Sequence, residues 1–476
     1  MKQKILLLFI FILTTCPFFA QKEANNWFFG KNIGLDFNNL QTTGGVVDMP
    51  TAVTGPINTT EGCFTVSDKD GNLIFSSDGI FVYDKNNNQM PNGYGLKGDP
   101  SSSQSGIGVP VPGDLNKYYI ISVPNEGTHD GLYYSIVDFS MNGGLGDISV
   151  KNQVLFNGDT SENICAVPQS NNIDYWIIHR SLDRFYVWSL TSLGFSSPVV
   201  YTIPGLMYNS SESIFRVGYT SVSSDMTRIV NCMILENMIF ADFDSDTGIL
   251  SNIKVRPING VYRAEFSPSG EWLYLSGHPA SLASIQETGL QAVRYADLQN
   301  DPNTPLSLIS SYNITNLQQH WDGRIYGTTY QKQDLYVMMN PDDGGTDIEY
   351  FQDFFNNETQ LGLPTFKTPN LNIKVNNPKE VCQKKDILFN ANLSYPVAAE
   401  FSHTYWDFGD NSPLIKNTLL GNYALTHQYA KPGTYKIVIT AYDQSDAVLK
   451  KHIFSIKISS CIIPVNHNIS VMGYYD

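Results

Sequence analysis

The sequence predicts an all-β protein with two parts, a long ring of repeated sheets and a shorter β unit behind it. Tyr and Phe number 27 and 26 in 476 residues while charged residues make up 16%, a balance that favours strands and turns over helices. A turn followed by an aromatic strand recurs along the front part, and an unrelated aromatic segment, Tyr405–Asp410, marks the second unit.

The first twenty residues have the features of a secretory signal. Lys2 and Lys4 precede an unbroken apolar run, Ile5–Leu13, which is too short to span a membrane. We expect cleavage after Ala20, so that the mature protein is exported, extracellular or on the outer cell surface, with no transmembrane segment. The alternative is a lipoprotein acylated at Cys16, where the sequence approaches a lipobox but has Thr before the cysteine.

Residues 25–370 contain a degenerate repeat. The residue just before each aromatic strand is at position 72, 117, 174, 227, 271 or 324, so the units are 44 to 57 residues apart. This period, with several strands in each unit, is typical of β-propeller blades, which must stack because one blade cannot bury both faces of its sheet. Six units are visible, and we expect a seventh from Trp27–Phe37 and Leu361–Phe366. Six blades is the alternative, and stacked sandwiches are the other interpretation of the strands.

The second unit resembles a PKD domain, an immunoglobulin-like β-sandwich. The motif residues are Trp406, Asp407, Phe408, Gly409, Asp410, Pro432, Gly433 and Tyr435. Trp406 and Phe408 alternate onto a core face, whereas the acids and glycines suit turns, so we expect a structural role for the whole motif. Pro and Asn residues predict a linker at 371–380. We expect the sandwich at 381–460 and an unstructured tail at 461–476.

The front part resembles the WD-repeat-like N-terminal propeller of exported surface proteins from Bacteroidetes-type bacteria. The resemblance is carried by these segments in order: Asn26–Gly30, Gly34–Phe37, Glu61–Cys63, Ser76–Gly79, Met90–Gly93, Asn142–Asp147 and Gly362–Pro364. It implies sorting by type IX secretion, often through a gliding-motility-associated C-terminal domain. Only 15 residues follow Cys461, so that domain is expected to be absent and the anchoring route stays open.

Charge and cysteines limit the partners and the chemistry. A net charge of −15 argues against nucleic acid, because phosphate binding needs concentrated Lys and Arg. Cys382 and Cys461 bracket the sandwich and could join its ends in a disulfide, as exported proteins permit. Cys63, Cys165 and Cys232 are widely spaced and are expected to be small buried residues.

Signatures of catalysis are absent from the sequence: there is no His-Glu-x-x-His, Gly-x-Ser-x-Gly or Walker motif. The strongest lone acid–base candidate is His129, with Asp130 and Glu126 close by, whereas His179 and His320 are expected to be structural. No catalytic residue and no cofactor are therefore predicted.

One acidic segment resembles a calcium loop. Asp242, Asp244 and Asp246 alternate as cation ligands do, but Ile253 stands where a bidentate acid would be needed. A hairpin turn is the favoured interpretation, and a calcium site at these three residues is the alternative.

The aromatic residues suggest a binding function. Trp176, Trp188 and Trp272 lie in strands and are expected to pack between blades, while Tyr94 and Trp321 lie in turns and are the candidate exposed pair. We therefore predict an exported binding or adhesion protein that recognises extracellular protein or glycan through the propeller. The alternatives are a secreted hydrolase or lyase acting on polysaccharide or peptide with a PKD accessory domain, and a component of a surface or motility assembly.

Overall fold

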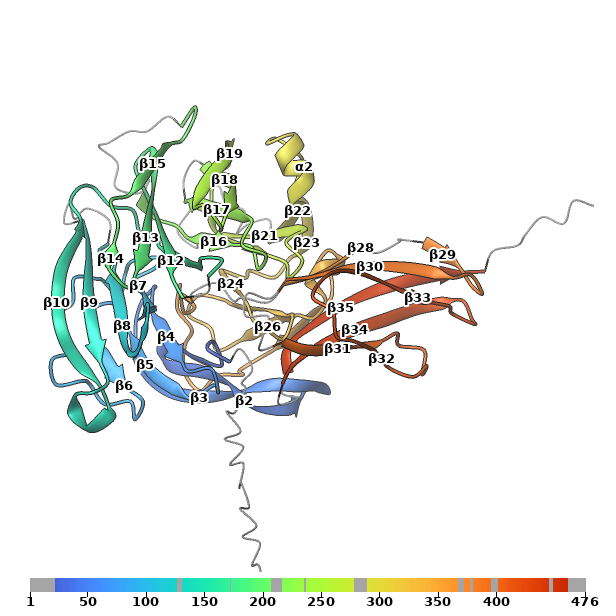
Figure 1. Ribbon diagram of the computed structural model, residues 1–476, viewed down its shortest axis with the longest axis horizontal. Helices are drawn as coiled ribbons and strands as arrows, with labels where there is room; N and C mark the ends of the chain where they lie inside the picture. Colours follow the sequence, from blue (N-terminus) through green and yellow to red (C-terminus); the bar gives the residue numbers. More distant parts are fainter. Residues whose placement is uncertain are drawn as a thin grey trace, which may run out of the picture.

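A computed structural model describes residues 22–125, 131–171, 173–206, 216–234, 237–277, 289–366, 372–376, 380–394, 401–444 and 448–460. These residues form two β units, a ring of sheets and a smaller sandwich that extends from one side of it (Figure 1). No described helix is both long and apolar enough to cross a membrane.

The ring contains seven antiparallel sheets, which we number blades 1 to 7 in chain order. Blade 1 has three strands: β1 (Asn26–Phe29), β2 (Lys31–Thr43) and β3 (Val46–Asn58). Blade 2 also has three: β4 (Phe64–Ser67), β5 (Leu73–Ser77) and β6 (Val82–Asp84). Blade 3 has four, with a 3-10 turn before the last: β7 (Gly106–Val111), β8 (Asp114–Ser122), β9 (Leu132–Asp138), η1 (Asn142–Gly144) and β10 (Asp147–Phe156).

Blades 5 to 7 repeat the four-stranded plan, and blade 4 has five strands. Blade 4 consists of β11 (Cys165–Pro168), β12 (Tyr175–Ser181), β13 (Arg184–Thr191), β14 (Gly194–Phe195) and β15 (Val199–Thr202). Blade 5 consists of β16 (Thr220–Val222), β17 (Arg228–Met233), β18 (Asn237–Asp244) and β19 (Ile249–Pro257). Blade 6 consists of β20 (Val261–Phe266), β21 (Trp272–Gly277), β22 (Leu290–Arg294), α2 (Tyr295–Asn300) and β23 (Ser307–Ser310). Blade 7 consists of β24 (Asn316–Gln319), β25 (Ile325–Thr328), β26 (Leu335–Met338), η3 (Pro341–Asp343) and β27 (Ile348–Phe351).

The repeat predicted from sequence corresponds to the second strand of blades 2 to 7. Five strands begin one residue after a predicted repeat position: β5 after 72, β12 after 174, β17 after 227, β21 after 271 and β25 after 324. Position 117 lies inside β8. The sequence signal is strongest here because the second strand is covered on both faces by neighbouring blades and so carries the largest apolar side chains.

Neighbouring blades share their hydrophobic cores. Phe75 of blade 2 packs in one cluster with Ile120 of blade 3, and each later pair of blades has a shared cluster of the same kind. The ring closes where Trp27 of blade 1 packs with Tyr326 of blade 7, with ring centroids 5.8 Å apart. The prediction of a seven-bladed propeller is confirmed.

The closing segment differs in one respect from the prediction. Leu361–Phe366 packs against blade 1 through Leu363 and Phe366, so the two ends of the propeller meet as expected. It forms no strand, however. Its amide groups at Leu361 and Thr365 instead donate to the carbonyls of Thr60 and Cys63, on the approach to blade 2. Blade 1 therefore consists of β1, β2 and β3 alone among the described strands.

The C-terminal sandwich has two sheets. The first pairs β28 (Asn372–Asn376), β30 (Ile387–Ser394) and β33 (Gly421–His427). The second has the order β29 (Glu380–Cys382), β35 (Val448–Ser459), β34 (Gly433–Asp443), β31 (Phe401–Asp407) and β32 (Ile415–Asn417). β29 runs parallel to β35, while the other pairs are antiparallel. The prediction of a linker at 371–380 is wrong for β28, because Ile373 and Val375 alternate toward the core as a paired strand requires.

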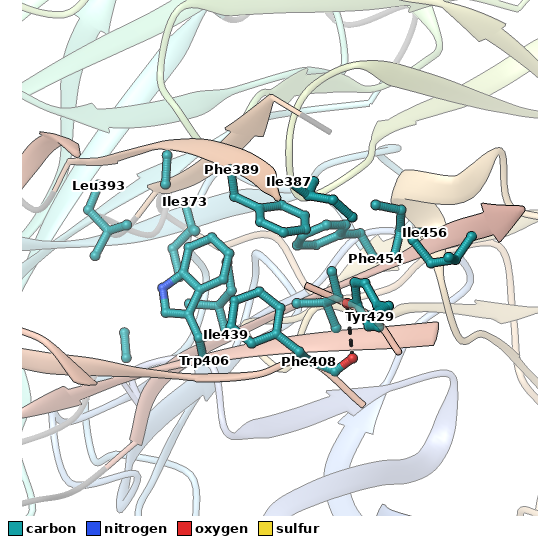
Figure 2. Packing of buried hydrophobic residues seen from close by; sticks show 14 of the residues in the cluster. Ile373, Ile387, Phe389, Leu393, Trp406, Phe408, Tyr429, Ile439, Phe454 and Ile456 are labelled. Atoms are coloured by element: carbon teal, nitrogen blue, oxygen red, sulfur yellow. Dashed lines mark hydrogen bonds between the residues drawn. The ribbon is translucent and has the colours of Figure 1, made fainter. Parts of the chain in front are cut away.

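Aromatic side chains fill the core between these sheets (Figure 2). Trp406 and Phe408 are 0% and 1% exposed, and the Tyr429 hydroxyl donates to the carbonyl of Phe408 at 3.1 Å. Tyr435 packs on Tyr429 with centroids 4.2 Å apart. The predicted motif therefore lies where the two sheets meet.

The sandwich contacts blade 7. His452 at the start of β35 has its Nδ1 3.3 Å from Oδ2 of Asp342 in η3, and both side chains are almost fully buried. Asp342 also accepts a hydrogen bond from the amide of Ser269 in blade 6, at 2.9 Å. Neighbouring strands of a blade run in opposite directions, so the third strand finishes at the same end of the propeller as the first. Because η3 follows the third strand of blade 7, this contact lies at the end where the first strands finish.

Gly362→Ala tests the closure of the ring. A Cβ at this position would lie 1.7 Å from the Glu61 carbonyl oxygen, and since both groups belong to backbone, neither can move aside cheaply. We expect the propeller to lose at least about 1–3 kcal/mol of stability, measured by chemical unfolding of the full chain. Gly433→Ala is the control, since its nearest atoms are 3.6 Å away. An equal effect of the two substitutions would contradict this account of closure.

Candidate functional site

Polar side chains converge at the end of the ring where the first strands of blades 2 to 6 begin. We call this cluster the hub. Every member is at most 9% exposed, and the members are Glu61, Ser103, Gln104, Glu162, Arg216, Tyr219, Tyr262 and Arg263. Six of them belong to segments that enter a blade from the preceding one, whereas Tyr262 and Arg263 lie at the start of β20.

One hydrogen bond in the hub connects blades on opposite sides of the ring. The Tyr262 hydroxyl at the start of blade 6 donates to Oε2 of Glu61, just before blade 2, at 2.8 Å. Burial first, and then the Glu61 carboxylate, raise the pKa of Tyr262 well above its usual value. The phenol therefore stays protonated and acts as a fixed donor.

Two neighbouring residues before blade 3 connect it to blades 4 and 5. Ser103 donates from its amide and its hydroxyl to Oε2 of Glu162, at 2.8 and 2.9 Å, and its hydroxyl accepts from the Gly218 amide. The Gln104 side-chain oxygen accepts from the amides of Ile164 and Thr220, at 3.1 and 2.9 Å. Backbone groups at the chain entries are thus satisfied by side chains of other blades.

Two arginines complete the hub. Arg263 donates to Glu265 at 3.2 Å and to Gln318, and its guanidinium lies 4.5 Å from the centre of the Tyr219 ring. Burial raises the pKa of Glu265 above its usual value, although the charge of Arg263 and its hydrogen bond act to lower that pKa. Arg216 lies 3.5 Å from Asp159. Both arginines keep Nε and Nη1 without a hydrogen bond to any described residue.

The chemistry available to this cluster is limited by its geometry. Glu61 and Glu162 accept hydrogen bonds from the protein's own hydroxyl and amide groups, and neither is more than 9% exposed. A general acid or base must reach a proton on its substrate. The described contacts of the hub therefore connect blades to one another.

The two aromatic residues predicted as a ligand pair lie in different places. Tyr94 is 50% exposed between blades 2 and 3, and Nζ of Lys151 sits 4.2 Å from its ring centre. Trp321 is half-buried, and its indole donates to Asn25 before blade 1, at 2.6 Å. Nothing in the described contacts brings them into one site.

The acidic loop of blade 5 is held as a hairpin turn. Asp242 accepts from the side chains of Asn252 and Gln299. Asp244 accepts from the Thr247 hydroxyl and the Asp246 amide, which together lower its pKa. No group of three metal-binding side chains occurs in the described part of the chain, so the geometry of Asp242, Asp244 and Asp246 favours the turn.

The histidines considered from sequence have structural surroundings. His179 is fully buried with its Nδ1 2.7 Å from the Asn163 carbonyl, and burial lowers its pKa to about 4. The ring of His320 stacks on the ring of Phe37, and the two ring centroids are 3.7 Å apart. His129, Asp130 and Glu126 lie outside the described residues.

The cysteines divide into two groups. Cys63, Cys165 and Cys232 are free and buried, as expected. Cys382 is disulfide-bonded, whereas Cys461 lies outside the described residues, so its pairing with Cys382 stays a prediction.

The acids of the sandwich motif support local turns. Asp407 accepts from the Gly409 amide at 2.9 Å, and Gly409 has φ +71° with Lys436 O 2.3 Å from where a Cβ would be. Asp410 accepts from the Ser412 amide, and its Oδ2 is 2.9 Å from Nε2 of His427. These contacts use both carboxylates within the sandwich.

Comparison with known proteins agrees with this two-part fold. Residues 367–458 match the family model of the PKD domain, and no curated protein matches the chain. The chain is thus an all-β protein, a seven-bladed propeller followed by a PKD domain.

Three solved structures are similar at low identity. The extracellular domain of the one component system BT4673 from B. thetaiotaomicron aligns with 93% of this chain and 57% of its own, at 11% identity and a TM-score of 0.36. The Dos1 propeller aligns with 71% of this chain and 86% of its own, at 9% identity and a TM-score of 0.36. The PKD domain of an M14-like peptidase from Thermoplasmatales archaeon SCGC AB-540-F20 covers 19% of this chain and 93% of its own, at 14% identity and a TM-score of 0.16. This chain spans little more than half of the BT4673 domain, and likenesses at these scores carry no functional argument.

Tyr262→Phe tests the hub as a structural element. The ring is kept, but Glu61 loses a hydroxyl donor in a buried setting, so we expect the free energy of unfolding to fall by about 1.5–3 kcal/mol. Denaturant unfolding of the full chain measures this. Tyr186→Phe, on a half-buried ring of blade 4, is the matched control. Similar stabilities for wild type and Tyr262→Phe would show that the bond is not needed.

Asp410→Asn tests the sandwich motif through pH. Burial raises the pKa of Asp410, but hydrogen bonds from Ser412 and His427 outweigh it and leave that pKa below its usual value. The carboxylate therefore contributes stability above the unfolded pKa of about 3.9, and this is lost as pH falls through the lower folded pKa. We expect Asp410→Asn to cost about 1–2 kcal/mol at pH 6 and progressively less as the pH falls from the unfolded pKa toward the lower folded pKa.

Calorimetry of the full chain between pH 6 and pH 3 measures the difference. Asp407→Asn is the control, because an amide oxygen can still accept from Gly409 and no partner charge is lost. A destabilisation by Asp410→Asn that stays constant with pH would contradict the proposed pairing.

Proposed function

We propose that this protein is an exported, non-catalytic binding or adhesion protein that recognises an extracellular protein or polysaccharide through its propeller. The observation that carries the proposal is the occupied hub. Glu61 and Glu162, the two acids of the hub, accept hydrogen bonds from the protein itself and are almost fully buried. Contact with a ligand is left to the loops that surround them.

The position of the PKD domain supports the same proposal. Its contact with blade 7, between His452 and Asp342, lies at the end of the ring opposite the hub. The closing segment, Leu361–Phe366, runs from the hub end toward the end that contacts the PKD domain. Leu361 packs with Tyr219 and Tyr262 of the hub, and the ring of Phe366 packs on the ring of Trp27. A domain attached there contacts the end opposite the hub through its described residues, which suits a spacer that presents the hub end outward.

Two measurements test the proposal. We expect the full mature chain to bind saturably to at least one component of a glycan array or to surfaces coated with extracellular protein, with heat-unfolded protein as the control. A screen of polysaccharide and peptide substrates should release no product. Blank results in both binding assays would overturn the binding function. Substrate turnover that is seen with the folded protein and disappears after heat unfolding would instead support the hydrolase or lyase alternative.

A further inference from the structure

Three tyrosines form an aromatic cluster on blade 7. Tyr336 on β26 and Tyr350 on β27 are directly opposite each other in the sheet, and Tyr312 comes from the segment that enters the blade. The ring centroids of the three pairs are 5.0, 5.1 and 5.4 Å apart. We call these residues the tyrosine cluster.

The cluster lies at the hub end of the propeller. β24 begins at this end, so β25 ends there and β26 begins there, one residue before Tyr336. The segment containing Tyr312 enters β24 from the same side. The cluster is therefore on the rim of the end that the PKD domain leaves uncovered.

The three rings differ in exposure. Tyr336 is 7% exposed and packs in the core shared by blades 6 and 7, whereas Tyr312 and Tyr350 are each 39% exposed. A buried ring thus supports two rings that solvent reaches. Tyrosine in this setting offers an apolar face and a polar edge, the combination that recurs at binding surfaces.

A carboxylate fixes one of the exposed rings. Asp334 accepts a hydrogen bond from the Tyr350 hydroxyl at 3.2 Å and from the Asp353 amide at 3.0 Å. Asp334 is itself 9% exposed. The Tyr350 ring is consequently held by stacking on Tyr336 and Tyr312 and by its hydroxyl, so little side-chain entropy remains to be lost on binding.

We propose that the tyrosine cluster is a binding platform for a neutral polysaccharide. This inference rests on the proposed binding function and names its ligand class and site. The face of an aromatic ring is electron-rich and suits the C–H groups on one face of a sugar ring, while the tyrosine hydroxyls can exchange hydrogen bonds with sugar hydroxyls.

Charge selects among polysaccharides. The platform contains Asp334 and no cation among the groups described above, and the chain carries a net charge of −15. A polyanion such as a uronate polymer would be repelled. A neutral chain has no such penalty, and its repeated sugars could occupy both exposed rings.

Affinity measurements on the full chain test the platform. The probes are soluble dextran, xyloglucan and galactomannan, with alginate as the anionic comparison. We expect at least one neutral polymer to bind and alginate not to bind. Tyr312→Ala/Tyr350→Ala should weaken that binding at least tenfold, whereas Phe81→Ala, on a ring elsewhere that is 36% exposed, should change it less than twofold.

Further variants separate stacking from folding. Tyr312→Phe/Tyr350→Phe keeps both faces and should retain most of the affinity. Tyr312→Ala alone leaves the paired strands intact, so its weaker binding at an unchanged melting temperature would support the platform even if the double variant is unstable. Unchanged binding in Tyr312→Ala and in the double variant would overturn the inference. Binding to protein surfaces but to no neutral polymer would overturn it while leaving the proposed function in place.

Discussion

The structure depends on one constraint, that a thin β-sheet must cover both of its faces. Each blade here shares its core with two neighbours, so no blade is complete alone. The ring is stable only when the last blade meets the first. That meeting uses a segment with no strand, Leu361–Phe366, whose Gly362 lies against the Glu61 carbonyl with no space for another carbon.

The same constraint explains why the hub is polar. Chain entries from successive blades are forced together at one end of the ring, where their backbone groups are shielded from bulk water and still need partners. Gln104 and Ser103 meet this need by bonding amides of two other blades. The acids and arginines there balance one another in the same shielded space. Their burial follows from ring closure and does not by itself indicate an active site.

The sequence was sufficient to predict the repeat, the number of blades and the sandwich, because second strands and the Tyr405–Asp410 segment have strong local patterns. It could not predict the hub. Glu61 and Tyr262 are 201 positions apart, and they meet only because blades 2 and 6 belong to one closed ring. The first strands are also short, with three residues in β16, and give little periodic signal.

The strand β28 and the tyrosine cluster escaped the sequence analysis for related reasons. Asn372–Asn376 lies among Pro and Asn residues that favour linkers, and only its pairing with β30 makes it a strand. Tyr312, Tyr336 and Tyr350 come from three segments whose spacing follows no rule until the blade is folded. The best signal in the sequence was that Tyr336 and Tyr350 lie on consecutive apolar segments. Antiparallel pairing of two such strands would place the two rings side by side.

The two ends of the propeller have different surroundings. At one end, His452 of the PKD domain meets Asp342 of blade 7, and both side chains are almost fully buried. At the other end, the hub acids Glu61 and Glu162 accept hydrogen bonds from the protein's own groups, and two rings of the tyrosine cluster are each 39% exposed. Ring closure thus buries the polar chain entries while it leaves these rings within reach of solvent.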